Sequence, residues 1–264
     1  MMNSALSIAA KDIREYFSSK ALVFSVVALP LLISVTVPSF IATLLSSIPT
    51  QISPQVTQFL PQVLKHALLT MGPKQALYWY MFSVVTLPIF LLLPITSVIV
   101  LASDSFAGEK ERKTIETLLS EPISLTELFI GKTLAPSVVA LCVTWISSTF
   151  YWSLATHFAS LVGVSLKPDL VWLSALLVLV PCITLANVGF VAWISSFSRG
   201  FKESQQLSGL LIIPVATLTL LSASGNLAPS LSLNLLMSVA YFGFFVLLSL
   251  LWPKLVNTSR LIES

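Results

Sequence analysis

The sequence is poor in charge, in cysteine and in histidine. Only 9 % of its 264 residues are charged, whereas a typical soluble domain has about 25 %. A soluble domain needs more polar surface than these residues supply, and the hydrophobic fraction of 56 % agrees with that. The two cysteines, Cys142 and Cys182, lie in apolar stretches, where a disulfide framework or a metal site is not expected. The composition therefore predicts an integral membrane protein with one membrane domain, residues 1–264.

The few charges are unevenly distributed. Residues 75–103 and 133–166 contain no Asp, Glu, Lys or Arg, while ten of the thirty residues in 103–132 are charged. A polar segment is therefore held between two hydrophobic spans.

The apolar runs predict six membrane-spanning helices, each with the approximately 20 residues that a bilayer core requires. Residues 204–253 hold no charge and are too long for one span, and turn residues at 224–229 divide them. The predicted fold is all-α, with spans at 21–45, 76–102, 133–156, 170–197, 205–223 and 231–252.

Residues 3–20 predict an amphipathic helix that lies in the membrane interface. We expect its charged side, which includes Asp12, to be opposite an apolar stripe of Leu6, Ala9, Ala10, Ile13, Tyr16 and Phe17. A signal peptide is the alternative, but the following apolar run is long and lacks a small-residue cleavage site. In the loop at 46–75, a short helix is expected at 56–69.

The basic residues predict the orientation. Six spans place both termini on one side, and eleven of the fourteen Lys and Arg residues fall on that side. The positive-inside rule then makes the termini and the polar segment cytoplasmic.

The polar segment contains two local helix signals. Glu109 with Lys113, and Arg112 with Glu116, are opposite charges four residues apart, which is typical of the exposed side of a helix. They predict an amphipathic helix at 109–119 that ends before Pro122. Ser124 and Glu127 have the spacing of a capping box, which predicts a second helix running through Gly131 and Lys132 into the third span. These residues alone leave open whether the segment is an ordinary connector.

The run 108–119, followed by Pro122-Ile123-Ser124 and Gly131-Lys132, resembles the cytoplasmic segment of the type-2 membrane permeases of ABC (ATP-binding cassette) transporters. A weaker similarity covers 192–197 and 205–214. The resemblance implies a transmembrane subunit, most often of an exporter, that works as a homodimer or heterodimer with separate ATP-binding subunits. ATP and Mg²⁺ would bind those subunits, with no cofactor in this chain.

The resemblance also implies that residues 103–132 are the segment that couples the permease to its ATPase; we refer to them as the coupling segment. Its expected contact or shape-determining residues are Gly108, Glu109, Glu111, Arg112, Thr114, Ile115, Glu116, Leu118, Leu119, Pro122, Ser124, Gly131 and Lys132.

Motifs for chemistry or nucleotide binding are not found in the sequence. Gly131-Lys132-Thr133 resembles the end of a phosphate-binding loop, but Thr126 stands where that motif needs glycine. The predicted spans hold no ionisable acid or base of the kind that proton relays use. We therefore expect no catalytic, cofactor or metal site and no nucleic-acid partner. An ATP-independent channel or carrier remains the alternative, and an intramembrane hydrolase is a third, less supported one.

Overall fold

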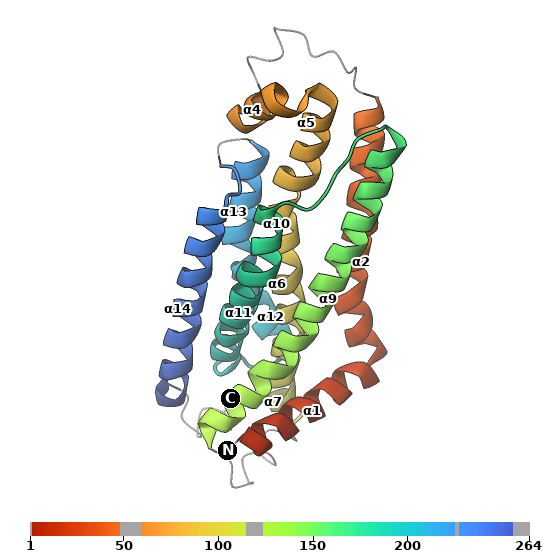
Figure 1. Cartoon of the computed structure of the whole chain (residues 1–264). Coiled ribbons are helices and arrows are strands. Elements are labelled where there is room, and N and C mark those ends of the chain that lie inside the picture. The colour runs from red at the N-terminus through yellow and green to blue at the C-terminus, as the bar shows by residue number, and fades with distance from the viewer. Residues whose placement is uncertain (1, 48–59, 115–123, 225–226, 256–264) are drawn as a thin grey trace.

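The computed structural model describes residues 2–47, 60–114, 124–224 and 227–255. Within these ranges every regular element is a helix, which confirms the predicted all-α class. The helices form an elongated bundle (Figure 1). Two short helices, α4 (Gln62–Met71) and α5 (Pro73–Trp79), lie at one end of it, and α1 (Met2–Ser18) lies at the other.

Six helical stretches are long and apolar enough to cross a membrane, which confirms the six predicted spans. The first, third and sixth are single helices, namely α2 (Lys20–Ser46), α9 (Leu125–Leu161) and α14 (Leu231–Leu255). The second consists of α5, the π turn η1 (Tyr80–Val85), α6 (Leu87–Ser103), the π turn η2 (Asp104–Gly108) and α7 (Glu109–Glu111). The fourth consists of α10 (Leu170–Ser174), the π turn η3 (Ala175–Leu179) and α11 (Val180–Ser195). The fifth consists of α12 (Phe201–Ser208), a 3₁₀ turn (Gly209–Leu211) and α13 (Ile212–Ala223).

The helices of the second and third spans continue beyond the predicted spans into the coupling segment. The helix of the second span runs to Glu111, and that of the third begins at Leu125, directly after the predicted capping residue Ser124. Both therefore contain charged residues that were expected in a connector. The extension is possible because these charges have partners inside the bundle, as described below. Of the short helix expected at 56–69, residues 56–59 lie outside the described residues, and α4 runs from Gln62 to Met71.

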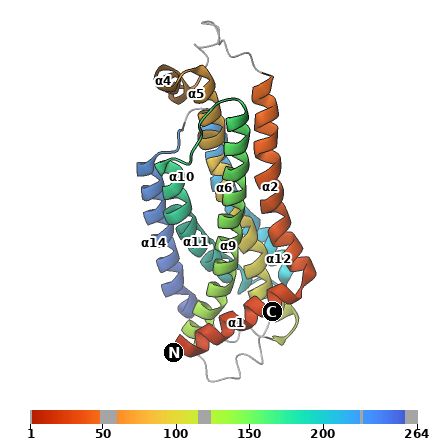
Figure 2. The ribbon, with the colours of Figure 1, turned by 45° about the vertical axis from the view of Figure 1, so that its right-hand side comes forward.

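Helix α1 crosses the base of the bundle and packs against α9 (Figure 2). The helix was predicted, and its predicted apolar stripe was partly correct. Ala9 and Tyr16 of the stripe are buried, but Leu6 and Phe17 are exposed. Ala5 and Ile8 are buried instead, together with Asp12. The periodicity could not place Asp12, because a carboxylate is buried only where another part of the chain supplies a cation or a donor.

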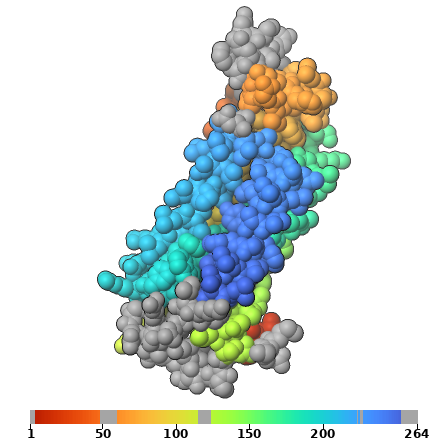
Figure 3. Space-filling view, turned by 90° about the vertical axis from the view of Figure 1, so that its left-hand side faces the viewer, coloured from red at the N-terminus to blue at the C-terminus, as the bar shows by residue number. Residues whose placement is uncertain are grey.

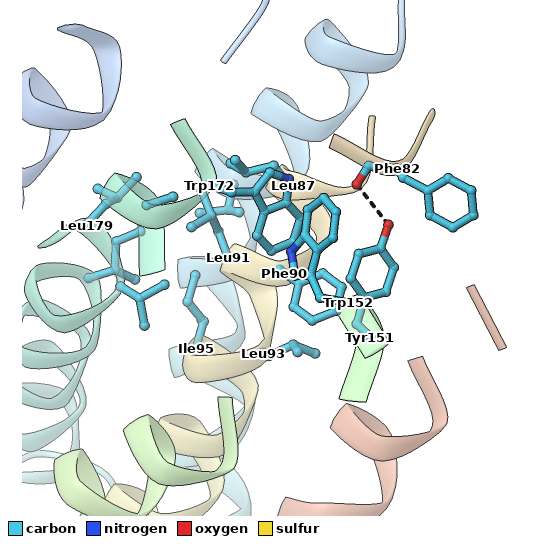
Figure 4. Packing of buried hydrophobic residues seen from close by; sticks show 14 of the residues in the cluster. Phe82, Leu87, Phe90, Leu91, Leu93, Ile95, Tyr151, Trp152, Trp172 and Leu179 are labelled. Carbon is cyan, nitrogen blue, oxygen red and sulfur yellow. Dashed lines mark hydrogen bonds between the residues drawn. The ribbon is translucent and has the colours of Figure 1, made fainter. Parts of the chain in front are cut away.

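The second span is the central helix of the bundle. In its most apolar window 72 % of the residues are buried, compared with 17 % for Leu231–Trp252. On the half of the bundle away from α1, an aromatic cluster joins this span to α9 and α10 (Figure 4). Phe90 packs 4.6 Å from Tyr151 between ring centroids, and Tyr151 stacks on Trp172 at 5.7 Å. Aromatic packing thus joins three helices in this half of the bundle.

The outer helices leave broad apolar faces. One side of the molecule is formed by α12, α13 and α14 (Figure 3). On α13 and α14, Leu220, Leu236 and Val239 are each at least 70 % exposed. Apolar faces of this extent suit hydrocarbon or another protein, not water.

Candidate functional site at the flanks of the coupling segment

The structure describes the two ends of the coupling segment, residues 103–114 and 124–132, which we call its flanks. The first flank is the end of the second span. The helix stops at Glu111, and the chain turns through Arg112 and Lys113, whose φ of 58° is in the left-handed region. A helix continuous over 109–119 is therefore wrong, and Glu109, expected on the exposed side of that helix, is buried. Ile115, Glu116, Leu118, Leu119 and Pro122 lie outside the described residues, and so does the pair of Arg112 with Glu116.

The second flank is the start of α9. The backbone N–H of Glu127 donates to Ser124 Oγ at 3.2 Å, and the Ser124 N–H donates to Glu127 Oε2 at 3.0 Å. This is the predicted capping box. The helix that it starts runs without interruption through Gly131 and Lys132 into the third span, as predicted.

A buried ion pair joins the two flanks. Lys132 Nζ lies 2.6 Å from Glu109 Oε2, and the two side chains are 0 % and 3 % exposed. The other carboxylate oxygen of Glu109 accepts a hydrogen bond from Lys11 Nζ on α1 at 3.0 Å. Lys132 also donates to the backbone oxygen of Ser105 in η2 at 2.7 Å. Removing one partner of such a pair leaves an uncompensated buried charge, which is strongly destabilising.

Asp12 brings a second carboxylate into the same cluster. Its Oδ2 accepts from Ser105 Oγ at 2.6 Å and lies 3.7 Å from Lys132 Nζ. Burial raises the pKa of the Asp12 carboxyl above its ordinary value, although Lys132 and Ser105 act in the opposite direction. The pKa of the Lys11 amine is also raised, because the hydrogen bond and charge of Glu109 outweigh the effect of burial.

The acidic groups of this cluster are matched by basic ones. Carboxylate oxygens of Asp12, Glu15 and Glu109 lie within 4.8 Å of one another, a spacing that a metal ion could span. Lys132 contacts Asp12 and Glu109, and Arg112 lies 3.6 Å from Glu15. Cationic side chains thus pair with each of these carboxylates, and the arrangement is an ion-pair network.

Two glycines of the predicted segment are explained by close approaches. A Cβ atom on Gly131 would lie 2.9 Å from the backbone oxygen of Ala5 and 2.9 Å from Ile8 Cβ. Glycine at 131 therefore lets α1 cross α9 next to Lys132. A Cβ on Gly108 would lie 2.8 Å from Asp104 Oδ1, the oxygen that accepts a hydrogen bond from Arg112 at 3.1 Å.

The remaining charged residues of α7 contact the turn between the fourth and fifth spans. Lys110 Nζ donates to the backbone oxygens of Ser196 and Ser198, at 3.4 and 3.2 Å. Glu111 Oε2 accepts from the N–H of Phe201 at 3.0 Å. Thr114, which was also expected in the coupling segment, donates through its hydroxyl to the backbone oxygen of Glu109 at 3.2 Å. The end of the second span is thus held by α1, α9 and the chain before α12.

Sequence reasoning missed the contributions of Lys11, Asp12 and Ser105. The available signal was the acidic residue Asp12 in the middle of the amphipathic helix, but no local feature of the sequence identified the residues that it contacts. The contacts of Lys11 and Asp12 join residues 98 and 93 positions apart.

The fold defines a multi-pass membrane protein with six spanning helices. Its buried ion pair joins the end of the second span to the beginning of the third. Comparison with known families identifies the protein further. Residues 6–232 match the family described as "ABC-2 family transporter protein", and the chain belongs to that family. It is a permease of the ABC transporter type.

A relative agrees with this assignment. The chain is 31 % identical over 145 residues to "ABC transporter permease protein NatB" from Bacillus subtilis (strain 168). The aligned stretch covers 49 % of this chain and 35 % of that protein. The chain thus matches about a third of the length of this curated relative.

Proposed function

We propose that this chain is the transmembrane subunit of an ABC exporter, driven by ATP that a separate ATP-binding subunit hydrolyses with Mg²⁺. The observation that carries the proposal is the buried pair of Glu109 and Lys132, which binds both flanks of the coupling segment to each other. A force applied to the residues between the flanks would therefore move the second and third spans as a unit.

The contacts of α1 and α12 widen that unit. Lys11 binds Glu109 from α1, and Glu111 binds the N–H of Phe201 at the start of α12. Displacing the coupling segment would thus act on four elements of the bundle at once. Alternating access needs such a concerted movement of helices around a substrate path.

The charge distribution supports a cytoplasmic location of this end. Lys11, Lys110, Arg112 and Lys132 all contribute to the cluster. In the whole sequence, eleven of fourteen Lys and Arg residues belong to this side. Both termini would then be in the cytoplasm, where an ATP-binding subunit could reach residues 112–123.

A second permease copy completes the proposed assembly. The windows of the first, fifth and sixth spans are only 22 %, 17 % and 17 % buried, so these helices offer the largest lateral faces. We propose a homodimer or heterodimer through part of this surface, with lipid covering the rest. The uncharged stretches 75–103 and 133–166 favour apolar or amphipathic cargo.

Co-purification with an ATP-binding subunit tests this function. The chain would be coexpressed with candidate ATP-binding subunits from neighbouring genes, purified in detergent, and assayed for partner content and vanadate-sensitive ATP hydrolysis. Glu116→Lys should reduce partner binding and transport, because a like charge at a charged contact costs several kcal/mol. Pro122→Ala should have a smaller effect.

Glu263→Lys is the matched control, because it makes the same change of charge in the carboxyl-terminal tail. It should leave partner binding intact, and all variants should remain monodisperse in detergent. If Glu116→Lys retains full binding and transport, the segment is only a connector. If the unmodified chain neither retains an ATP-binding subunit nor gives vanadate-sensitive ATP hydrolysis, an ATP-independent channel or carrier is the better assignment.

A further inference from the structure

Three π turns interrupt the spanning helices. Two are in the second span, η1 near the aromatic cluster and η2 at the ion-pair cluster, and η3 is in the fourth. A π turn contains one residue more than the α-helix accommodates, and such turns occur often at functional sites. The extra residue can move along a helix by local changes of hydrogen bonding, without unfolding it.

All three π turns receive a hydrogen bond from a side chain of α9. Lys132 Nζ donates to the Ser105 oxygen of η2 at 2.7 Å. Trp145 Nε1 donates to the backbone oxygen of Leu176 in η3 at 3.0 Å. Tyr151 Oη donates to the backbone oxygen of Phe82 in η1 at 2.9 Å (Figure 4). Over the described part of the chain, every hydrogen bond from an α9 side chain to the backbone of another element ends on a π turn.

The two contacts on the second span are far apart. Residues 132 and 151 are separated by about 28 Å along α9, at 1.5 Å per residue. This is close to the approximately 30 Å thickness of the hydrocarbon core. Lys132 belongs to the ion-pair cluster, and Tyr151 belongs to the aromatic cluster, where its hydroxyl is also 2.8 Å from Thr86 Oγ1. One continuous helix therefore links the π turns at opposite ends of the second span.

We propose that Lys132 and Tyr151 are positioning residues that hold α9 on the two π turns of the second span, so that a displacement at the ion-pair cluster is transmitted to η1 and the aromatic cluster. What produces the displacement rests on the proposed function, in which the ATP-binding subunit acts on the coupling segment. The far end of the second span would thus respond to an event at the cytoplasmic end, because the π turn at η1 would shift its position along the helix.

Ordinary helix packing makes a different prediction. Substitutions more than about 7–10 Å apart, without shared partners, normally have additive effects. A change at Glu109 should then alter hydrogen exchange at the amides of residues 80–86 only as far as it lowers the stability of the whole protein. Coupling between these two sites is the property that distinguishes the proposal.

The test is hydrogen–deuterium exchange of the purified full chain in nanodiscs, read in peptides that cover residues 80–86. Tyr151→Phe removes the hydroxyl and should raise exchange there about fivefold, the loss of one hydrogen bond in the local opening equilibrium. Glu109→Gln removes the counterion of Lys132 and should also raise exchange at 80–86. In the double variant the increase should not exceed that of Tyr151→Phe alone, because the link is already broken.

Tyr241→Phe is the matched control, since it removes a tyrosine hydroxyl from α14. In that background Glu109→Gln should keep its full effect on residues 80–86. If Glu109→Gln prevents folding, Glu109→Asp keeps the charge, shortens the side chain and carries the same expectations. The proposal is overturned if the Glu109 variant leaves exchange at 80–86 unchanged, or if the two increases multiply in the double variant.

The exchange measurement requires neither ATP nor a partner, so its result is separate from that of the co-purification test. If exchange is coupled but the chain retains no ATP-binding subunit in the co-purification test, the proposed function is refuted and the linkage through α9 stands. Uncoupled exchange in a chain that does bind an ATPase would refute the linkage alone.

Discussion

Replacing Lys132 by Met is the most direct test of the ion-pair cluster. The substitution removes the cation that lies 2.6 Å from Glu109 and 3.7 Å from Asp12, and it removes the donor to the Ser105 oxygen. Lys132 and Glu109 are essentially unexposed, so water cannot replace the lost contacts. Methionine is unbranched like lysine and only one atom shorter, which limits the change in packing.

The expected loss follows from the geometry. Breaking a buried ion pair by removing one partner costs about 3–5 kcal/mol. Lys11 still contacts Glu109 at 3.0 Å, but its side chain is 49 % exposed and supplies only part of the compensation. We therefore expect Lys132→Met to lower the free energy of unfolding by about 3 kcal/mol, the lower end of that range.

A double variant separates the unpaired charge from other effects. Adding Glu109→Gln removes the carboxylate that Lys132→Met leaves without its main partner, so the loss should fall to about 1–2 kcal/mol. The free energy of unfolding would be measured by reversible denaturation in mixed detergent micelles, followed by tryptophan fluorescence. Unchanged stability of Lys132→Met, or a double variant at least as unstable as the sum of the two single variants, would refute the assignment of a buried ion pair.

Three further predictions concern Asp12, Gly131 and the orientation. Because burial raises the pKa of Asp12, its contribution to stability should be full below its ordinary pKa near 3.8 and be lost as the pH rises through the raised value. Asp12→Asn should flatten this part of a stability-against-pH curve, and an unchanged slope would contradict the shift. Gly131→Ala should destabilise the protein by about 1–3 kcal/mol, because its Cβ would meet α1 at 2.9 Å. Gly209→Ala, with nothing within 4 Å, is the control, and equal melting temperatures would disprove the close approach. A cysteine at Ser120 should react with an impermeant thiol reagent only in opened cells, and one at Gln55 in intact cells; the reverse pattern would invert the topology.

The sequence by itself determined the six spans and the start of α9. Both depend on local properties. An apolar run of sufficient length is favourable in a bilayer whatever other helices lie beside it. The Ser124–Glu127 capping box needs only its own four residues. The order of the elements could be obtained in the same way. The family pattern was also local, since it occupies one continuous stretch.

Only the tertiary structure decided which charges are paired. Helical spacing assigned Glu109 to Lys113, but Glu109 pairs with Lys132 and Lys11, which different helices bring to it. The same contacts explain why the second span continues through charged residues and why Asp12 is buried. A charge enters a bundle only where a distant residue neutralises it, and no local periodicity records that residue. The three π turns depend on the tertiary structure for the same reason, because the side chains of α9 that bind them come from elsewhere in the chain.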